Sequence, residues 1–155
     1  PVYLRFGRPK VANFTPADEP FVIGKAQMLQ EGTDVTIFAC GHLVWKAVQA
    51  LPILKEMGIN AELINIHTIK PLDVEAVIAS AKKTGCVVTA EEHQLNGGLF
   101  DSISQVLSMN CPTPIEPVAI FDQYGQSGTP DELMKHYHLD TEDIVAAAKK
   151  AVARK

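Results

Sequence analysis

Apolar and polar residues follow one another in blocks that predict alternating strands and helices. Continuous apolar runs are typical of strands buried in a parallel sheet, and they occur at residues 35–40, 61–66, 86–89 and 116–121. Apolar residues at helical spacing predict helices over residues 43–57 and 73–83, after Gly98, after Thr129 and from about Thr141. Right-handed crossovers between such units give an α/β fold: an open, mostly parallel sheet with helices on both faces.

Short polar signals mark the expected ends of these helices. Asp73 is a candidate N-cap, and Gly85 is the expected stop of the helix that follows it. Thr129 and Glu132 have the spacing of a capping box, which predicts a helix start. Before the first buried strand, residues 21–31 predict a short strand pair or an extended segment.

The first twenty residues differ from the rest of the chain. Residues 7–20 hold three prolines and little apolar periodicity, which is typical of a linker. The apolar run at residues 2–6 resembles the last strand of a preceding domain, and the chain begins without methionine. We therefore expect a piece of a longer polypeptide, in which residues 1–20 are the end of a preceding domain plus a linker and residues 21–155 are one domain.

Composition narrows the functional class. Hydrophobic content of 46%, charged content of 21% and a net charge of -4 are ordinary for a globular domain and argue against a nucleic-acid binder. No apolar run approaches the length that spans a bilayer, so we expect no membrane association. The three cysteines, Cys40, Cys86 and Cys111, are odd in number and far apart, which favours a reducing compartment such as the cytoplasm.

The strongest candidate for chemistry is the segment that follows the third buried strand. It carries Glu91, Glu92 and His93, and then Gly97 and Gly98, which let backbone approach another group closely at the start of a helix. One interpretation is a strand-end turn whose acids face solvent or another domain, with His93 hydrogen-bonded locally. The other is that an acid and His93 stabilise an interface beside an active site or contact a substrate.

Other candidates are weaker. Arg8 follows the opening apolar run, and its guanidinium is either an exposed linker group or a bidentate phosphate ligand. His136 and His138 are not accompanied by further ligand residues at metal-site spacing, so they do not indicate a metal site. No Gly-x-Gly-x-x-Gly follows the first buried strand. We assign no catalytic residue and no metal ligand within this chain.

Four segments together resemble the C-terminal domain of transketolases. They read LRFGRP at residues 4–9, NIHTIKPLD at residues 65–73, EEH followed by GG at residues 91–98, and SGTPDEL at residues 127–133. They occur in the order and at the spacing of that family, so the resemblance covers nearly the whole chain. The combination is specific for the wider group of thiamine-diphosphate enzymes that are similar to transketolase.

The resemblance implies an activity that belongs to the intact enzyme. Transketolases of the pentose phosphate pathway move a two-carbon ketol unit between sugar phosphates, use thiamine diphosphate and magnesium, and work as homodimers. The third domain, which this chain resembles, binds no cofactor, packs on the two domains before it and adds to the dimer, so the isolated piece is expected to be inactive. Arg8 matches by position an arginine that binds the substrate phosphate. Phe100 stands where the family often has a small residue, which argues against a role that needs close backbone approach there.

Alternatives remain open within and outside this family. Deoxyxylulose-phosphate synthase and the beta subunit of 2-oxoacid dehydrogenases share the Glu-His and Gly-Gly pattern, although residues 69–73 favour transketolase. A free-standing binding or regulatory module is the alternative from another class. If the domain packs on upstream domains or on a separate subunit, we expect an apolar surface near residues 93–100 to make that contact.

Overall fold

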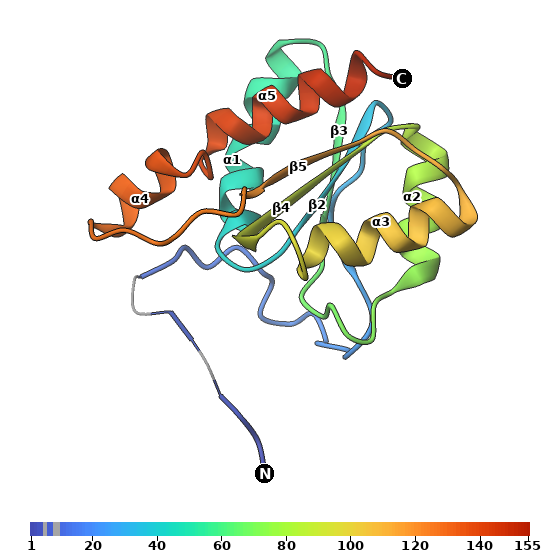
Figure 1. Ribbon diagram of the computed structural model, residues 1–155. Coiled ribbons are helices and arrows are strands. Elements are labelled where there is room, and N and C mark those ends of the chain that lie inside the picture. The colour runs from blue at the N-terminus through green and yellow to red at the C-terminus, as the bar shows by residue number, and fades with distance from the viewer. Residues whose placement is uncertain (5, 8–9) are drawn as a thin grey trace.

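The computed structural model describes residues 1–4, 6–7 and 10–155 of the chain. Ten elements follow one another, and strands and helices alternate through most of the domain (Figure 1). Their bounds are β1 Gln27–Gln30, β2 Val35–Ala39, α1 Leu43–Glu56, β3 Ala61–Asn65, α2 Val74–Thr84, β4 Val87–Gln94, α3 Leu99–Asn110, β5 Ile115–Ile120, α4 Pro130–His136 and α5 Thr141–Val152. Among the helices so described, none has both the length and the apolar character that crossing a membrane requires.

The strands form one five-stranded sheet in the order β1-β3-β2-β4-β5. Strands β3, β2, β4 and β5 run parallel to one another, and β1 pairs antiparallel with β3 at one edge. Helices α1 and α5 cover one face of the sheet, while α2 and α3 cover the other (Figure 1). The predicted α/β fold, an open and mostly parallel sheet with helices on both faces, is confirmed.

Burial on both faces explains why β2 and β3 are mostly apolar. Every residue of these two strands is buried, and alternate side chains enter opposite halves of the core. Ile37 packs in the half beneath α1 and α5, whereas its neighbour Phe38 packs beneath α2 and α3. A polar residue in either strand therefore has to find a hydrogen-bond partner inside the protein.

The capping signals act as the sequence predicts. The Asp73 side chain accepts a hydrogen bond from the backbone N–H of Ala76 at the start of α2, and Gly85 ends that helix with a φ of +73°. Thr129 and Glu132 form the capping box of α4. A second capping box, made by Asp140 and Asp143 at the start of α5, was not predicted.

Two boundaries differ from the prediction. The expected pair or extended segment at residues 21–31 contains a single strand, β1. The expected turn at Glu91, Glu92 and His93 is wrong, because β4 continues through these residues to Gln94. Charged residues are uncommon inside strands, so the pattern ends the strand too early; here the buried Glu91 side chain has partners inside the domain.

The N-terminal segment contains neither helix nor strand in its described residues. The side chains of Val2, Tyr3 and Leu4 are largely exposed, so whether this run is a strand of a preceding domain stays a prediction. The predicted linker nevertheless contacts the domain: the Glu19 carboxylate accepts a hydrogen bond from the Gln27 side chain at 2.7 Å, and Phe14 packs on α1. Phe14 stacks on Trp45 of α1 with ring centroids 6.1 Å apart, and it packs against the core.

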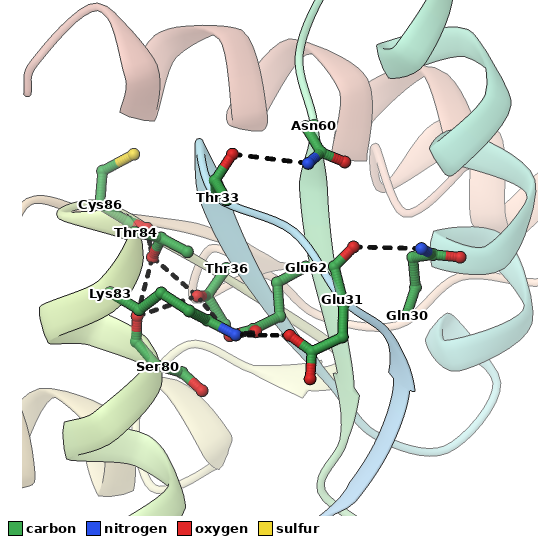
Figure 2. A network of polar contacts seen from close by, with 10 residues as sticks. All are labelled: Gln30, Glu31, Thr33, Thr36, Asn60, Glu62, Ser80, Lys83, Thr84 and Cys86. Carbon is green, nitrogen blue, oxygen red and sulfur yellow. Dashed lines mark hydrogen bonds and ion pairs between the residues drawn. The ribbon is translucent and has the colours of Figure 1, made fainter.

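A buried polar network joins α2 to the sheet (Figure 2). Glu62 of β3 is fully buried and forms an ion pair with Lys83 of α2, which also contacts Glu31 at 2.7 Å. Thr36 of β2 donates a hydrogen bond to Glu62 and lies 2.7 Å from the Thr84 hydroxyl. Hydrogen bonds to Glu31 and Glu62 raise the pKa of Lys83 above its ordinary value of 10.5. The network thus keeps Lys83 charged beside a carboxylate that has no access to water.

We expect Lys83→Met to destabilise the fold by about 2–3 kcal/mol at neutral pH, because it leaves the Glu62 carboxylate buried without its counter-ion. Lys82→Met, at the exposed neighbouring position, is the matched control and should change the unfolding free energy by about 0.5 kcal/mol or less. Chemical denaturation of the three proteins measures this. Since the pKa of Lys83 is raised on folding, its contribution is present at neutral pH and is lost as the pH rises past 10.5. A cost for Lys83→Met that equals that of the control would contradict the network's role.

Candidate functional site

The carboxyl ends of the parallel strands meet along one side of the sheet, which we call the carboxyl edge. From β2 the chain turns through α1 toward β3, whereas from β4 it turns through α3 toward β5 on the opposite face. The neighbouring ends of β2 and β4 are therefore the point where the connections diverge, and open α/β sheets usually bind ligands at such a point. The predicted site residues Glu91, Glu92 and His93 lie there, in the last part of β4.

Glu91 is buried, and its side chain caps the first turn of α3, whose N-cap residue is Gly98. Its side chain is 1% exposed, and its two carboxylate oxygens accept hydrogen bonds from the backbone N–H groups of Leu99 at 2.7 Å and Phe100 at 2.8 Å. Two of the helix's unpaired donors are thereby satisfied by a negative charge at the positive end of the helix dipole. The interpretation that both acids face solvent or another domain is therefore wrong for Glu91.

Gly98 makes this capping contact possible. A Cβ atom at position 98 would lie 2.0 Å from the Glu91 Oε2 atom, so any larger residue would displace the carboxylate. Gly97 has a φ of +84°, which favours glycine, and its N–H donates to Asp101 at 2.6 Å. The predicted close approach is confirmed at Gly98 but not at Gly97, where an added Cβ atom would meet nothing within 4 Å. The objection raised by Phe100 fails because only the backbone N–H of that residue takes part.

Glu92 points to the other face of the sheet and joins the ends of β4 and β2. One of its carboxylate oxygens lies 2.8 Å from the Nδ1 atom of His42, the residue just before α1, and both side chains are partly exposed. If the neutral ring donates through Nδ1, its Nε2 atom is left as an acceptor. Sequence reasoning missed His42; the available signal was its place two residues after the end of a predicted strand.

His93 is half-exposed and bonded locally, as one of the two interpretations predicts. Its Nδ1 atom lies 2.8 Å from the carbonyl oxygen of Gln94 and 4.0 Å from Glu91. Because a carbonyl oxygen only accepts hydrogen bonds, Nδ1 is the donor and Nε2 is an acceptor in the neutral ring. His93 therefore offers a hydrogen-bond acceptor at the carboxyl edge, beside the start of α3.

The thiol nearest to this site is not a nucleophile. Burial, with a smaller contribution from the nearby Glu91 carboxylate, raises the pKa of Cys40 to about 12. The thiol is therefore protonated at neutral pH, and only a thiolate attacks electrophiles efficiently. Nor do the described residues bring together three or more histidine, cysteine, aspartate or glutamate side chains that could hold a metal ion.

The structure thus separates the predicted site residues into two groups. Glu91, Gly97 and Gly98 build the junction of β4 and α3, whereas Glu92 and His93 present polar atoms at the carboxyl edge. Arg8, the predicted phosphate ligand, lies outside the described residues.

The chain is similar over most of its length to proteins of one family. Residues 24–144 match the family model described as "Transketolase, C-terminal domain". A 6-deoxy-6-sulfo-D-fructose transketolase subunit of Clostridium sp. is 43% identical over 155 residues, which are 100% of this chain and 48% of that protein. One subunit of the apulose-4-phosphate transketolase of Phocaeicola vulgatus is 41% identical, over 99% of this chain and 49% of its own length. The chain therefore spans about half the length of these two relatives.

More distant relatives and a solved structure agree with this match. The 1-deoxy-D-xylulose-5-phosphate synthase of Heliobacterium modesticaldum is 34% identical over 96% of this chain and 24% of that enzyme. Among solved structures, one titled "Split gene transketolase, inactive beta4 tetramer" superimposes with a TM-score of 0.89. It is 40% identical to this chain, and the match covers 92% of this chain and 47% of that one.

We expect Glu91→Gln to destabilise the domain by about 2 kcal/mol, since the amide keeps one acceptor oxygen and turns a donor toward a backbone N–H that needs an acceptor. Glu92→Gln is the matched control at the next position and should cost about 0.5 kcal/mol or less, because an exposed ion pair contributes little. Thermal and denaturant unfolding measure both. Equal stability of the two variants would contradict the capping role of Glu91.

Proposed function

The chain belongs to the family of transketolase C-terminal domains, and from this premise we propose that it is the C-terminal part of an enzyme that transfers a two-carbon ketol unit between sugar phosphates. In that enzyme it supports assembly and dimerisation, while by itself it is inactive. We place the enzyme in the cytoplasm, as a homodimer. The observation that carries the proposal is the 43% identity, along the whole chain, to a protein named as a transketolase subunit.

Thiamine diphosphate and magnesium do not fit the residues of this domain. The buried carboxylates of the described residues are Glu62, Glu91 and Glu116, and each is already engaged. Glu62 pairs with Lys83, Glu91 caps α3, and Glu116 contacts Lys150 and Arg154. None is left to bind a divalent cation or a cofactor ring. We therefore assign the cofactor and the metal to the part of the enzyme that precedes this domain.

Arg8 is the one residue of this chain to which we assign contact with substrate. The resemblance to transketolases gives it the position of an arginine that binds the substrate phosphate, and a planar guanidinium can donate two parallel hydrogen bonds to phosphate oxygens. Glu92 and His93 have the exposure and the acceptor atoms of interface residues at the carboxyl edge. We assign them to contacts with the rest of the enzyme.

Deoxyxylulose-phosphate synthase is the second candidate. The 34% identity over 96% of the chain to such an enzyme favours it over other reactions of the wider group. Identity to the two transketolase subunits is higher, at 43% and 41%. This difference supports ketol transfer as the first choice. A free-standing regulatory module receives less support, since both of these relatives are named as subunits of enzymes.

Reconstitution tests the proposal. The chain is mixed with the part of the enzyme that precedes it, thiamine diphosphate and Mg²⁺ are added, and ketol transfer from xylulose 5-phosphate to ribose 5-phosphate is followed. 6-Deoxy-6-sulfo-D-fructose and apulose 4-phosphate serve as further donors. Activity with any of these donors, in the mixture only, is the expected result. Turnover restricted to pyruvate and glyceraldehyde 3-phosphate would move the chain to the synthase, and no turnover in a demonstrated complex would contradict both.

In the assembled enzyme we expect Arg8→Ala to raise the KM for a phosphorylated donor roughly tenfold or more, because a charge-assisted contact is worth about 1.5–3 kcal/mol. The KM for unphosphorylated D-xylulose should change little, since it has no phosphate to lose contact with. Lys10→Ala is the matched control for the loss of a positive charge nearby. Equal effects on the two donors would contradict a phosphate contact at Arg8.

A further inference from the structure

More large apolar side chains are exposed at the carboxyl edge of the sheet than at its opposite end. At the end of the sheet opposite the carboxyl edge, Met57 and Met109 are exposed singly at the last turns of α1 and α3. At the carboxyl edge, beside β1 and β3, five apolar side chains are exposed within two short segments. We call this group the apolar platform: Phe21, Val22, Ile23, Ile69 and Val74.

The two segments of the platform lie side by side. Phe21 packs against His67 with ring centroids 4.3 Å apart. The backbone N–H of Ala26 donates to the Asp73 carboxylate at 3.0 Å, and Lys25 forms an ion pair with the same carboxylate. These contacts tie the segment before β1 to the loop between β3 and α2.

The platform is held in place although its side chains face water. Phe21 is 68% exposed and Ile23 is 71% exposed, while the turn beneath them is closed by a hydrogen bond from the Lys25 N–H to the Val22 carbonyl. Gly24 has a φ of +80° and packs against Pro71. Five exposed apolar side chains on two adjacent, fixed backbone segments are unusual on a protein that stands alone and mark a contact surface. Its preorganisation lowers the conformational entropy lost on docking.

An open, mostly apolar groove lies between β1 and α2, and its lining residues Ala26 and Ala76 are close in sequence to the two platform segments. It encloses about 310 Å³ and has small side chains such as Ala26, Ala76 and Ala79 in its lining, with Met28 and Ile64 beside them. Small residues leave room for an apolar side chain of a partner to enter from the platform side. Lys83, held by Glu31 and Glu62, lines the groove as well.

The predicted contact near residues 93–100 does not have this character. Leu99 is fully buried in the domain's own core, and the exposed residues between positions 93 and 100 are His93, Asn96 and Gly97. Leu99 does not supply the expected exposed apolar surface, since it packs beneath α3 instead. The exposed apolar side chains beside this stretch are Phe121 and Tyr124, which follow the residue of β5 that pairs with Gln94. The platform is a separate apolar surface, on the β1 side of the carboxyl edge.

We propose that the apolar platform and its groove are the surface on which the preceding half of the transketolase-type protein docks. This rests on the proposed function. The chain spans 48% and 49% of the length of the two transketolase subunits to which it is similar, and the family model identifies it as the C-terminal domain, so the remaining half precedes it. The described residues 10–20 reach the first platform segment along the same side of the domain, in the lower part of the view (Figure 1). The occupant presents apolar side chains, one of which fills the groove.

Hydrogen exchange tests the location of the interface. Amide exchange is measured for the chain alone and for its complex with the preceding half, without substrates or cofactor. Residues 21–26 and 67–74 should exchange at least tenfold more slowly in the complex, while residues 107–111, around Met109, stay unchanged. Protection confined to other surfaces would overturn the proposal. So would protection of the platform in the chain alone that depends on protein concentration, because a second copy of this chain would then be the occupant.

Substitution supplies an independent measurement. Phe21→Ser combined with Ile23→Ser should weaken binding of the preceding half by roughly tenfold or more. Met57→Ser combined with Met109→Ser, which removes two exposed apolar side chains at the opposite end of the sheet, should weaken it less than twofold. Circular dichroism checks that both double variants fold. Equal effects of the two pairs would overturn the proposal. A complex that forms through the platform yet transfers no ketol unit would contradict the proposed function alone.

Discussion

The contact between the Glu91 carboxylate and the first turn of α3 is the constraint on which the carboxyl edge of this domain depends. The Glu91 side chain is only 1% exposed, so its charged carboxylate is stable only if its hydrogen bonds are made inside the protein. Glu91 makes two of them with the backbone at the start of α3. The contact fixes where the chain leaves β4, at the point where the connections of the sheet diverge. It also requires glycine at position 98, because a Cβ atom there would overlap the carboxylate.

Other buried carboxylates hold the remaining layers in the same way. Glu62 ties α2 to β3 through Lys83, and Glu116 ties α5 to β5 through Lys150 and Arg154. Each of the three acids thus lies on a strand and attaches a different helix to the sheet. Because such groups are costly to leave unpaired, each helix has one strongly preferred position. A domain built in this way suits the role in assembly that we propose for it, because that role needs rigid placement of its outer surfaces.

The outer surfaces differ in their chemistry. The middle of the carboxyl edge is polar, with the His42–Glu92 pair and the acceptor atom of His93. The part beside β1 is apolar and fixed by Asp73. A partner that covers both parts has to bring hydrogen-bond donors and apolar side chains together, which provides specificity in addition to affinity.

The sequence by itself determined the order of strands and helices, because periodic burial leaves a direct pattern of apolar residues. It also determined the caps at Asp73 and Thr129, whose partners lie three residues away, and, through four short segments, the family. Only the tertiary structure decided that Glu91 caps backbone N–H groups eight and nine residues later, that Glu92 meets His42, and that exposed apolar side chains gather around Phe21 and Ile23. Each of these depends on which residues folding brings together, and a pattern read along the chain carries no such distances.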